Sequence, residues 1–83
     1  LAHESMTGFF SDKYLPEIDQ PLTVREKETL RWTALGKTYF EIGMILTIDI
    51  RTVKFHLVNA MRKLQANNKT QAAVKASLLG LLF

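Results

Sequence analysis

The feature that most constrains this sequence is a very short joint between two helical segments near its centre. The stretch FEIGMIL ends at Leu46 and a capping residue follows at Asp49, so only residues 47–49 separate the two segments. A joint this short suits two helices that cross steeply, as in a helix-turn-helix. Gly43 costs about 1 kcal/mol relative to alanine inside a helix. Close approach of the next helix would offset that cost, with a simple kink as the alternative.

Residues that favour helix N-termini recur along the chain and predict the other helices. Two pairs have the spacing of a capping box and two residues are single caps: Thr23 with Glu26, Thr38 with Glu41, Asp49, and Asn68. These signals predict helices over residues 23–35, 38–46, 49–64 and 68–80. No strand pattern occurs between them. The expected fold is therefore an all-α, four-helix bundle that contains a helix-turn-helix without a wing.

The first part of the chain is expected to be an arm and a linker. Residues 11–22 contain both prolines and show no helical period. We therefore divide the chain into an N-terminal arm and interdomain linker, residues 1–21, and a helix-turn-helix domain, residues 22–83. The chain begins with Leu1 rather than Met, which suggests a piece of a longer protein.

Composition argues against several classes of protein. The absence of cysteine excludes disulfides and thiolate metal sites and suits a cytoplasmic protein. No apolar run approaches the roughly 18 residues of a membrane span, so no membrane partner is expected. His3-Glu4 lacks the second histidine of a zinc-protease motif, and there is no glycine-rich phosphate loop. We therefore expect no enzyme, no catalytic residue, no metal and no cofactor site.

The net charge of +3 conceals a strong asymmetry between the two parts of the chain. Residues 1–21 carry a balance of −3, whereas residues 22–83 carry ten Lys or Arg against four acidic residues. No acidic residue follows Asp49. Such a one-sided block favours a polyanionic partner, either nucleic acid or an anionic lipid surface. A merely solvated basic helix is the simpler alternative.

Helix 49–64 has an apolar side and a basic side. At 100° per residue one stripe should face the core: Val53, Leu57, Ala60 and Leu64. The opposite side is basic and apolar, which fits a recognition helix in the major groove of DNA. The residues expected to face bases are Arg51, Lys54, Phe55 and Val58. This hypothesis requires an exposed Phe55 and an Arg51 that is not directed at a neighbouring carboxylate; packing of Phe55 on the N-terminal arm is the alternative.

A second group of residues is expected to contact DNA phosphates. The start of helix 38–46 offers free amides and a positive dipole end, and helix 49–64 carries further cations and a first-turn hydroxyl. The candidates are Lys37, Thr38, Tyr39, Thr52, Arg62 and Lys63.

Residues 22–82 resemble the LuxR-type DNA-binding domain. The resemblance rests on REKE-x-LRW, GKT, EI-x-x-IL, TVKFH, RKL and the final GLL at their spacings in this chain. The stretch RWTALGKT is more similar to the quorum-sensing branch, which responds to acyl-homoserine lactones, than to the response-regulator branch. Gly43 stands where the family commonly has alanine, and Thr29 where it commonly has a larger apolar residue. Both departures suggest a slightly looser core.

The resemblance implies a function and a set of partners. In the quorum-sensing branch an N-terminal domain binds the signal, and the C-terminal domain binds palindromic double-stranded DNA as a dimer. It therefore implies sequence-specific DNA binding in a bacterial cytoplasm, a homodimer, and RNA polymerase as a further partner. The acyl-homoserine lactone is expected only in a domain outside this chain. The alternative function is a protein-interaction module that blocks a related regulator by forming mixed dimers.

The last helix has two apolar sides. One stripe can close the core: Ala72, Ala76, Leu79 and Phe83. The family pairs subunits through this helix, so the resemblance places the other side at a two-fold contact. Its residues are Val74, Ser77, Leu78 and Leu81. Packing of this second side under the N-terminal arm is the alternative.

Overall fold

The computed structural model describes residues 20–83 of the chain. Residues 1–19, on which nearly all of the expected arm and linker falls, lie outside the described part. Within residues 20–83 there are four helices and no strands: α2 (Val24–Ala34), α3 (Tyr39–Leu46), α4 (Ile50–Leu64) and α5 (Lys69–Leu78). The predicted all-α, four-helix fold is confirmed.

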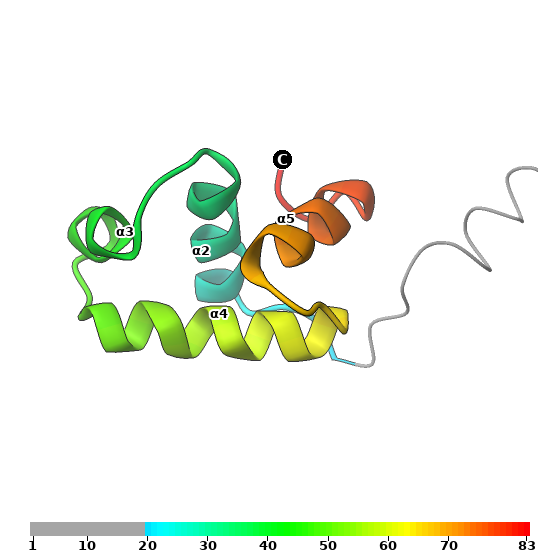
Figure 1. Cartoon of the computed structure of the whole chain (residues 1–83), viewed down its shortest axis with the longest axis horizontal. Coiled ribbons are helices and arrows are strands. Elements are labelled where there is room, and N and C mark those ends of the chain that lie inside the picture. The colour runs from blue at the N-terminus through cyan, green and yellow to red at the C-terminus, as the bar shows by residue number, and fades with distance from the viewer. Residues whose placement is uncertain (1–19) are drawn as a thin grey trace, which may run out of the picture.

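The longest helix, α4, forms the base on which the others rest (Figure 1). Helices α2 and α5 pack on α4 and on each other, and α3 packs mainly on the N-terminal end of α4. The face of α4 that points away from this body carries no other helix of the described part (Figure 1). The arrangement therefore leaves one long side of α4 open.

The four helices begin directly after the capping residues that were predicted from the sequence. Both capping boxes are formed: Thr23 Oγ1 accepts from the amide of Glu26 at 3.1 Å, and Thr38 Oγ1 accepts from the amide of Glu41 at 3.1 Å. Asp49 and Asn68 cap α4 and α5. These side chains satisfy amides that lack a partner within the helix.

One helix end differs from the prediction. Helix α2 ends before Gly36, as expected, where the chain adopts a φ of 88°. Helix α5 ends at Leu78, two residues before the predicted end at Gly80. The amides of Leu79 and Gly80 donate to Lys75 and Ser77, which tightens the last turn and closes the helix early.

Every helix contributes to a single core. Leu30 of α2, Ile42 of α3, the predicted α4 stripe and two alanines of α5 are buried together. The alanines Ala72 and Ala76 have small side chains, which lets α5 approach its neighbours closely. Thr29 is also fully buried, but its hydroxyl donates to the carbonyl of Arg25 at 2.6 Å. The hydroxyl therefore has a hydrogen-bond partner, which offsets the cost of removing it from water.

The joint between α3 and α4 consists of the three predicted residues and is tightly closed. Thr47 takes the left-handed conformation with a φ of 58°, and the amide of Ile48 donates to the carbonyl of Gly43 at 2.9 Å. A Cβ atom at Gly43 would lie 2.8 Å from the carbonyl oxygen of Ile48 and 3.8 Å from Val53 Cγ2. The predicted close approach is confirmed, although the nearest atom belongs to the turn rather than to α4.

This geometry predicts the cost of a side chain at the joint. Gly43→Val should destabilise the fold by about 1–3 kcal/mol, because backbone atoms would have to move away from the new side chain. Met44→Val introduces the same residue one position along at an exposed site, so it controls for helix propensity. Urea unfolding measures both variants. Equal stability of the two variants would show that the close approach costs nothing to disturb.

Candidate nucleic-acid interface

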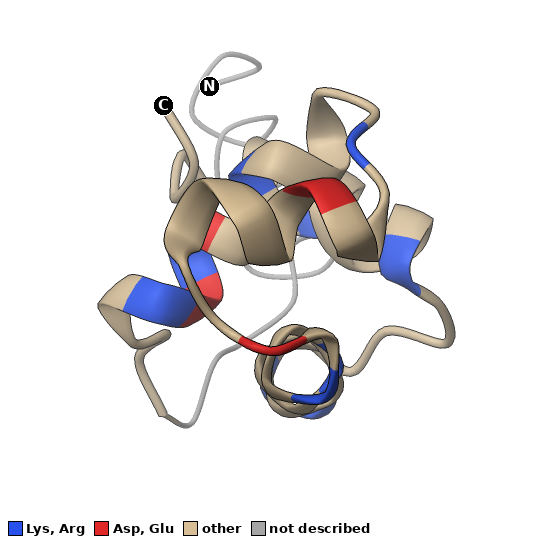
Figure 2. Ribbon diagram, turned by 90° about the vertical axis from the view of Figure 1, so that its left-hand side faces the viewer, with Lys and Arg blue, Asp and Glu red and all other residues tan. Residues whose placement is uncertain are grey.

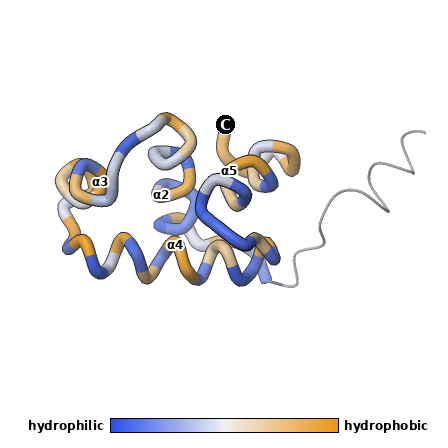
Figure 3. Tube along the Cα trace, viewed as in Figure 1, coloured by the Kyte–Doolittle hydropathy of each residue, from blue (hydrophilic) through white to orange (hydrophobic). Residues whose placement is uncertain are grey.

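The rotation of α4 about its own axis decides which residues it presents to solvent. Its core stripe is buried as predicted, with Val53, Ala60 and Leu64 fully covered. On the opposite side Phe55 is 62% exposed and Val58 is 61% exposed. Figure 2 looks along α4 and shows Lys and Arg positions on its side away from the body, while Figure 3 shows hydrophobic and hydrophilic positions alternating along it. Two apolar side chains therefore do stand on an exposed basic surface.

The exposed side of α4 has the composition that was predicted for it. We call Arg51, Lys54, Phe55, Val58 and Arg62 the α4 ridge; all five are exposed. Thr52 is half-buried beside them. A shallow hollow on this surface is lined by Asp49, Arg51, Thr52 and Phe55. Within residues 20–83, Phe55 has no cover from another helix, so the described part gives no support to its burial.

Arg51 was expected not to point at a neighbouring carboxylate, and the structure differs from this expectation. Its Nε atom lies 3.5 Å from Asp49 Oδ1, so the side chain does approach a neighbouring carboxylate. The same Oδ1 accepts the amide of Arg51 at 2.7 Å, and this hydrogen bond is the main reason that the pKa of Asp49 lies below its usual range. However, the Arg51 side chain is 92% exposed, and an ion pair between exposed side chains contributes little to stability. The contact is therefore weak enough for a stronger acceptor to replace it.

The start of α3 offers backbone amides to an anion, but shares them with a carboxylate. The amide of Thr38 donates to Glu41 Oε1 at 2.9 Å. This hydrogen bond, together with a second one from the Thr38 hydroxyl, keeps the pKa of Glu41 below its usual range. The amides of Tyr39 and Phe40 come next and have no partner within the helix. Lys37, whose positive charge also favours the ionised Glu41, lies at the same end. Two amides and one cation thus remain for a phosphate.

Tyr39 brings together two cations that are far apart in the sequence. Lys54 Nζ lies 5.5 Å from the centre of the Tyr39 ring, and Lys69 Nζ lies 4.3 Å from it. Lys54 belongs to α4, whereas Lys69 is the first residue of α5. The sequence analysis did not select Lys69, because nothing in the local sequence shows that the start of α5 lies beside the start of α3.

Lys63 is not available as a phosphate contact, so that prediction is wrong. Its Nζ atom lies 2.8 Å from Glu26 Oε1 and donates to the carbonyl of Pro21 at 3.2 Å. The side chains of Lys63 and Glu26 are only 10% and 4% exposed. Lys63 points along the core side of α4 instead of the ridge, and it ties α4 to the start of α2.

Burial and hydrogen bonding act in opposite directions on Glu26. Burial raises the pKa of Glu26, but hydrogen bonds from Lys63 and Thr23 and the nearby charges of Lys63 and His56 outweigh it. The net pKa lies below its usual range. Glu26 therefore stays ionised, and its two hydrogen bonds join the helix cap to the ion pair.

The residues expected at a two-fold contact divide into two groups. Val74, Ser77 and Leu78 are exposed on α5. Leu81 lies beyond the end of the helix and is half-buried against the core, so it does not continue their row. The order at the C-terminus also differs from the predicted stripe, because Leu82 is buried and Phe83 is exposed.

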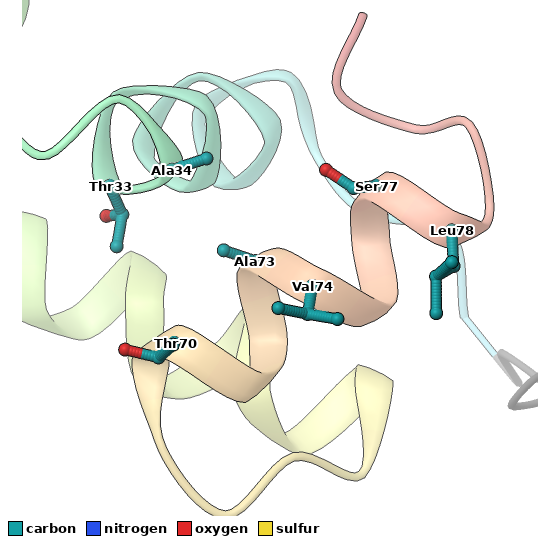
Figure 4. Close-up of a pocket in the computed structure, with 7 residues that line it drawn as sticks. All are labelled: Thr33, Ala34, Thr70, Ala73, Val74, Ser77 and Leu78. Atoms are coloured by element: carbon teal, nitrogen blue, oxygen red, sulfur yellow. The ribbon is translucent and has the colours of Figure 1, made fainter.

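An apolar groove runs between α2 and α5 beside these residues (Figure 4). It encloses about 440 Å³, and its lining consists of small and apolar side chains: Thr33, Ala34, Thr70, Ala73, Val74, Ser77 and Leu78.

Within residues 20–83, no helix is long and apolar enough to cross a membrane.

Residues 20–76 match the family model described as bacterial regulatory proteins, luxR family. The chain belongs to this luxR family. The family consists of regulatory proteins, and it places the chain among transcription regulators rather than enzymes.

Individual relatives of this luxR-family chain agree with the match. It is 52% identical over 82 residues to the transcriptional activator protein SolR of Ralstonia nicotianae, covering 99% of this chain and 35% of SolR. A crystal structure of Escherichia coli SdiA superposes with a TM-score of 0.75 at 45% identity, over 98% of this chain and 35% of that one. The chain thus spans about a third of the length of these relatives.

A third comparison concerns a protein of similar size. The structure of the transcription factor GerE superposes with a TM-score of 0.71 at 29% identity, over 77% of this chain. The match covers 97% of the GerE chain. The luxR-family helices therefore make up almost the whole of that solved chain.

The Lys63–Glu26 pair predicts a pH-dependent contribution to stability. Glu26→Gln should lower the free energy of unfolding at pH 7 by about 3 kcal/mol, the lower end of the range for breaking a buried pair, since Lys63 keeps the Pro21 carbonyl. Because the pKa of Glu26 is lowered on folding, this stability is present above the pKa of the unfolded state and is lost as the pH falls through the lower pKa of the folded state.

Urea unfolding between pH 7 and pH 3 measures this effect. The difference between the wild type and Glu26→Gln should shrink towards the acid end. Glu28→Gln is the control, because it removes a half-buried carboxylate of the same helix that lies 3.6 Å from Arg25. It should cost less than about 1 kcal/mol. A constant difference across the pH range would contradict the assignment.

Proposed function

We propose that this chain binds double-stranded DNA in a sequence-specific manner, as the DNA-binding domain of a quorum-sensing transcriptional regulator. The observation that supports it most is the α4 ridge, which places Phe55 and Val58 in the open among Arg51, Lys54 and Arg62. Two apolar side chains on a basic surface fit a partner that offers both phosphates and thymine methyl groups.

The major groove of a duplex accepts a helix of this shape. Its width of about 12 Å admits one α-helix, and one long side of α4 is covered by no other helix of the described part. Arg51 near the start of α4 can donate to O6 and N7 of guanine, and Phe55 and Val58 can contact thymine methyl groups. Arg62, about three turns after Arg51, is a phosphate contact, as are Lys37 and the amides at the start of α3.

We further propose that two copies bind a palindromic site by pairing through α5. Val74 and Leu78 are exposed beside the apolar groove, and Ala73 and Ser77, which also line this groove, have small side chains that let a second helix approach. A two-fold contact uses the same surface on both copies, so each α5 would lie against the other. Two helices α4 would then meet successive half-sites about one helical turn apart.

The other partners belong to the longer protein of which this chain would be a part. We propose that an acyl-homoserine lactone binds outside this chain, that the protein works in the bacterial cytoplasm, and that it also contacts RNA polymerase. The exposed apolar residues of α3, Phe40, Met44 and Ile45, offer a surface for that last contact. A mixed-dimer inhibitor is less well supported, because it would need no exposed cations on α4.

The base-contact assignment predicts a sequence-dependent loss of affinity. Arg51→Ala should weaken binding to a duplex selected from random DNA by about 1–3 kcal/mol, which is about 5- to 150-fold. Binding to a scrambled duplex should weaken much less. Arg25→Ala on α2 removes an exposed arginine as a control. Equal losses on both duplexes would mean that Arg51 contacts phosphates and not bases.

The pairing surface predicts a loss of cooperativity. On a palindromic duplex two copies of the wild type should bind cooperatively, and Leu78→Lys should bind without cooperativity, because it places a charge in the apolar contact. Val24→Lys changes another exposed apolar residue, on α2, and serves as the control. Titration with analytical ultracentrifugation gives the stoichiometry. Unchanged cooperativity in Leu78→Lys would exclude α5 as the contact.

A further inference from the structure

Three separate elements meet at the ring of Tyr39. Tyr39 is the first residue of α3, Lys54 stands in the second turn of α4, and Lys69 is the first residue of α5. Both ammonium groups lie within 6 Å of the ring centre, at 5.5 Å and 4.3 Å. A cation at this distance from an aromatic face is attracted by the ring. The ring therefore holds two cations of different helices in one place.

This cluster carries charge that no carboxylate of the described part neutralises. The ion pairs within residues 20–83 involve Arg25, Arg51 and Lys63, but neither Lys54 nor Lys69. Two like charges beside one ring repel each other, and an anion between or beside them would remove that cost. The free amides at the start of α3 add further positive potential at the same end.

The position of Lys69 is unfavourable for the helix that contains it. A lysine in the first turn faces the positive end of the helix dipole, where an acidic residue would be stabilising. Asn68 already caps this helix by accepting the amide of Gln71 at 2.8 Å. Lys69 therefore does not serve the stability of α5, and its charge is available to a partner.

We propose that Lys69 contacts a DNA backbone phosphate and that Tyr39 is the positioning residue that aligns Lys69 with Lys54. This inference rests on the proposed function and extends it, because it brings α5 into contact with the duplex as well as α3 and α4. The ring holds the Lys69 ammonium beside the start of α3, so that Lys69 and the amides of Tyr39 and Phe40 would contact the same DNA strand. Phosphate contacts of this kind fix the register of the protein without reading sequence.

The test measures the salt dependence of binding by the 83-residue chain. Each contacted phosphate contributes about −0.9 to the slope of log K against log salt. Lys69→Gln should make the slope shallower by about 0.9 and weaken a selected duplex and a scrambled duplex by the same factor. Lys27→Gln, which removes the same charge from α2, is the control and should leave the slope unchanged. Circular dichroism melting checks that each variant is folded.

A double-mutant cycle tests the role of Tyr39. Tyr39→Leu should weaken binding in the wild type and weaken it much less when Lys69 is already Gln, because the ring then has one cation fewer to align. Tyr39→Phe keeps the ring and should retain the coupling to Lys69. A purely structural Tyr39 would give the same loss in both backgrounds, and that result would overturn its positioning role.

The outcomes separate this inference from the function on which it rests. If the wild type binds neither duplex at about 50 mM salt, the proposed function fails and the phosphate contact fails with it. If the wild type binds but Lys69→Gln keeps the full slope, the phosphate contact alone is wrong. An equal change of slope in Lys27→Gln would also overturn it, because the effect would then reflect net charge.

Discussion

Burial of one narrow stripe of α4 is the constraint on which the rest of the molecule depends. Val53, Leu57, Ala60 and Leu64 fix the rotation of the helix about its axis, because turning it would expose these side chains and bury charged ones. The same rotation directs Phe55 and Val58 to solvent. The core and the proposed interface are thus two sides of one helix, and any rotation of α4 about its axis would move both.

The turn before α4 fixes the direction of the helix as the stripe fixes its rotation. Thr47 accepts a left-handed backbone conformation that costs a residue with a branched Cβ about 1–2 kcal/mol. The amide of Ile48 closes on the carbonyl of Gly43, where a side chain would collide with the turn. The start of α3 is therefore held next to the second turn of α4, and amides of one helix lie beside cations of the other.

The sequence was sufficient for those features that depend on neighbouring residues. Two capping boxes and the single caps Asp49 and Asn68 located all four helix starts, and the helical period separated the buried stripe of α4 from its exposed side. Belonging to the luxR family could be recognised from motifs at fixed spacing. What the sequence did not predict depends on contacts between distant segments.

Lys63 and Lys69 illustrate this limit in opposite ways. Lys63 has the same neighbours in the sequence as a phosphate-binding lysine would have. Only the folded position of Glu26, 37 residues earlier, shows that its ammonium group is already paired with a carboxylate. Lys69 looked like an ordinary surface lysine until the fold placed it over Tyr39. Leu81 was misplaced for a third reason: the early end of α5 broke the period on which its position was based.

The bond from Lys63 to the carbonyl of Pro21 also has a mechanical meaning. The described chain enters the body beside the last turn of α4, at the far end from Arg51 (Figure 1). A force on the entering chain at Pro21 would reach α4 through this bond. The nearly buried Lys63 therefore couples the position of the entering chain to that of α4, the helix proposed to read bases.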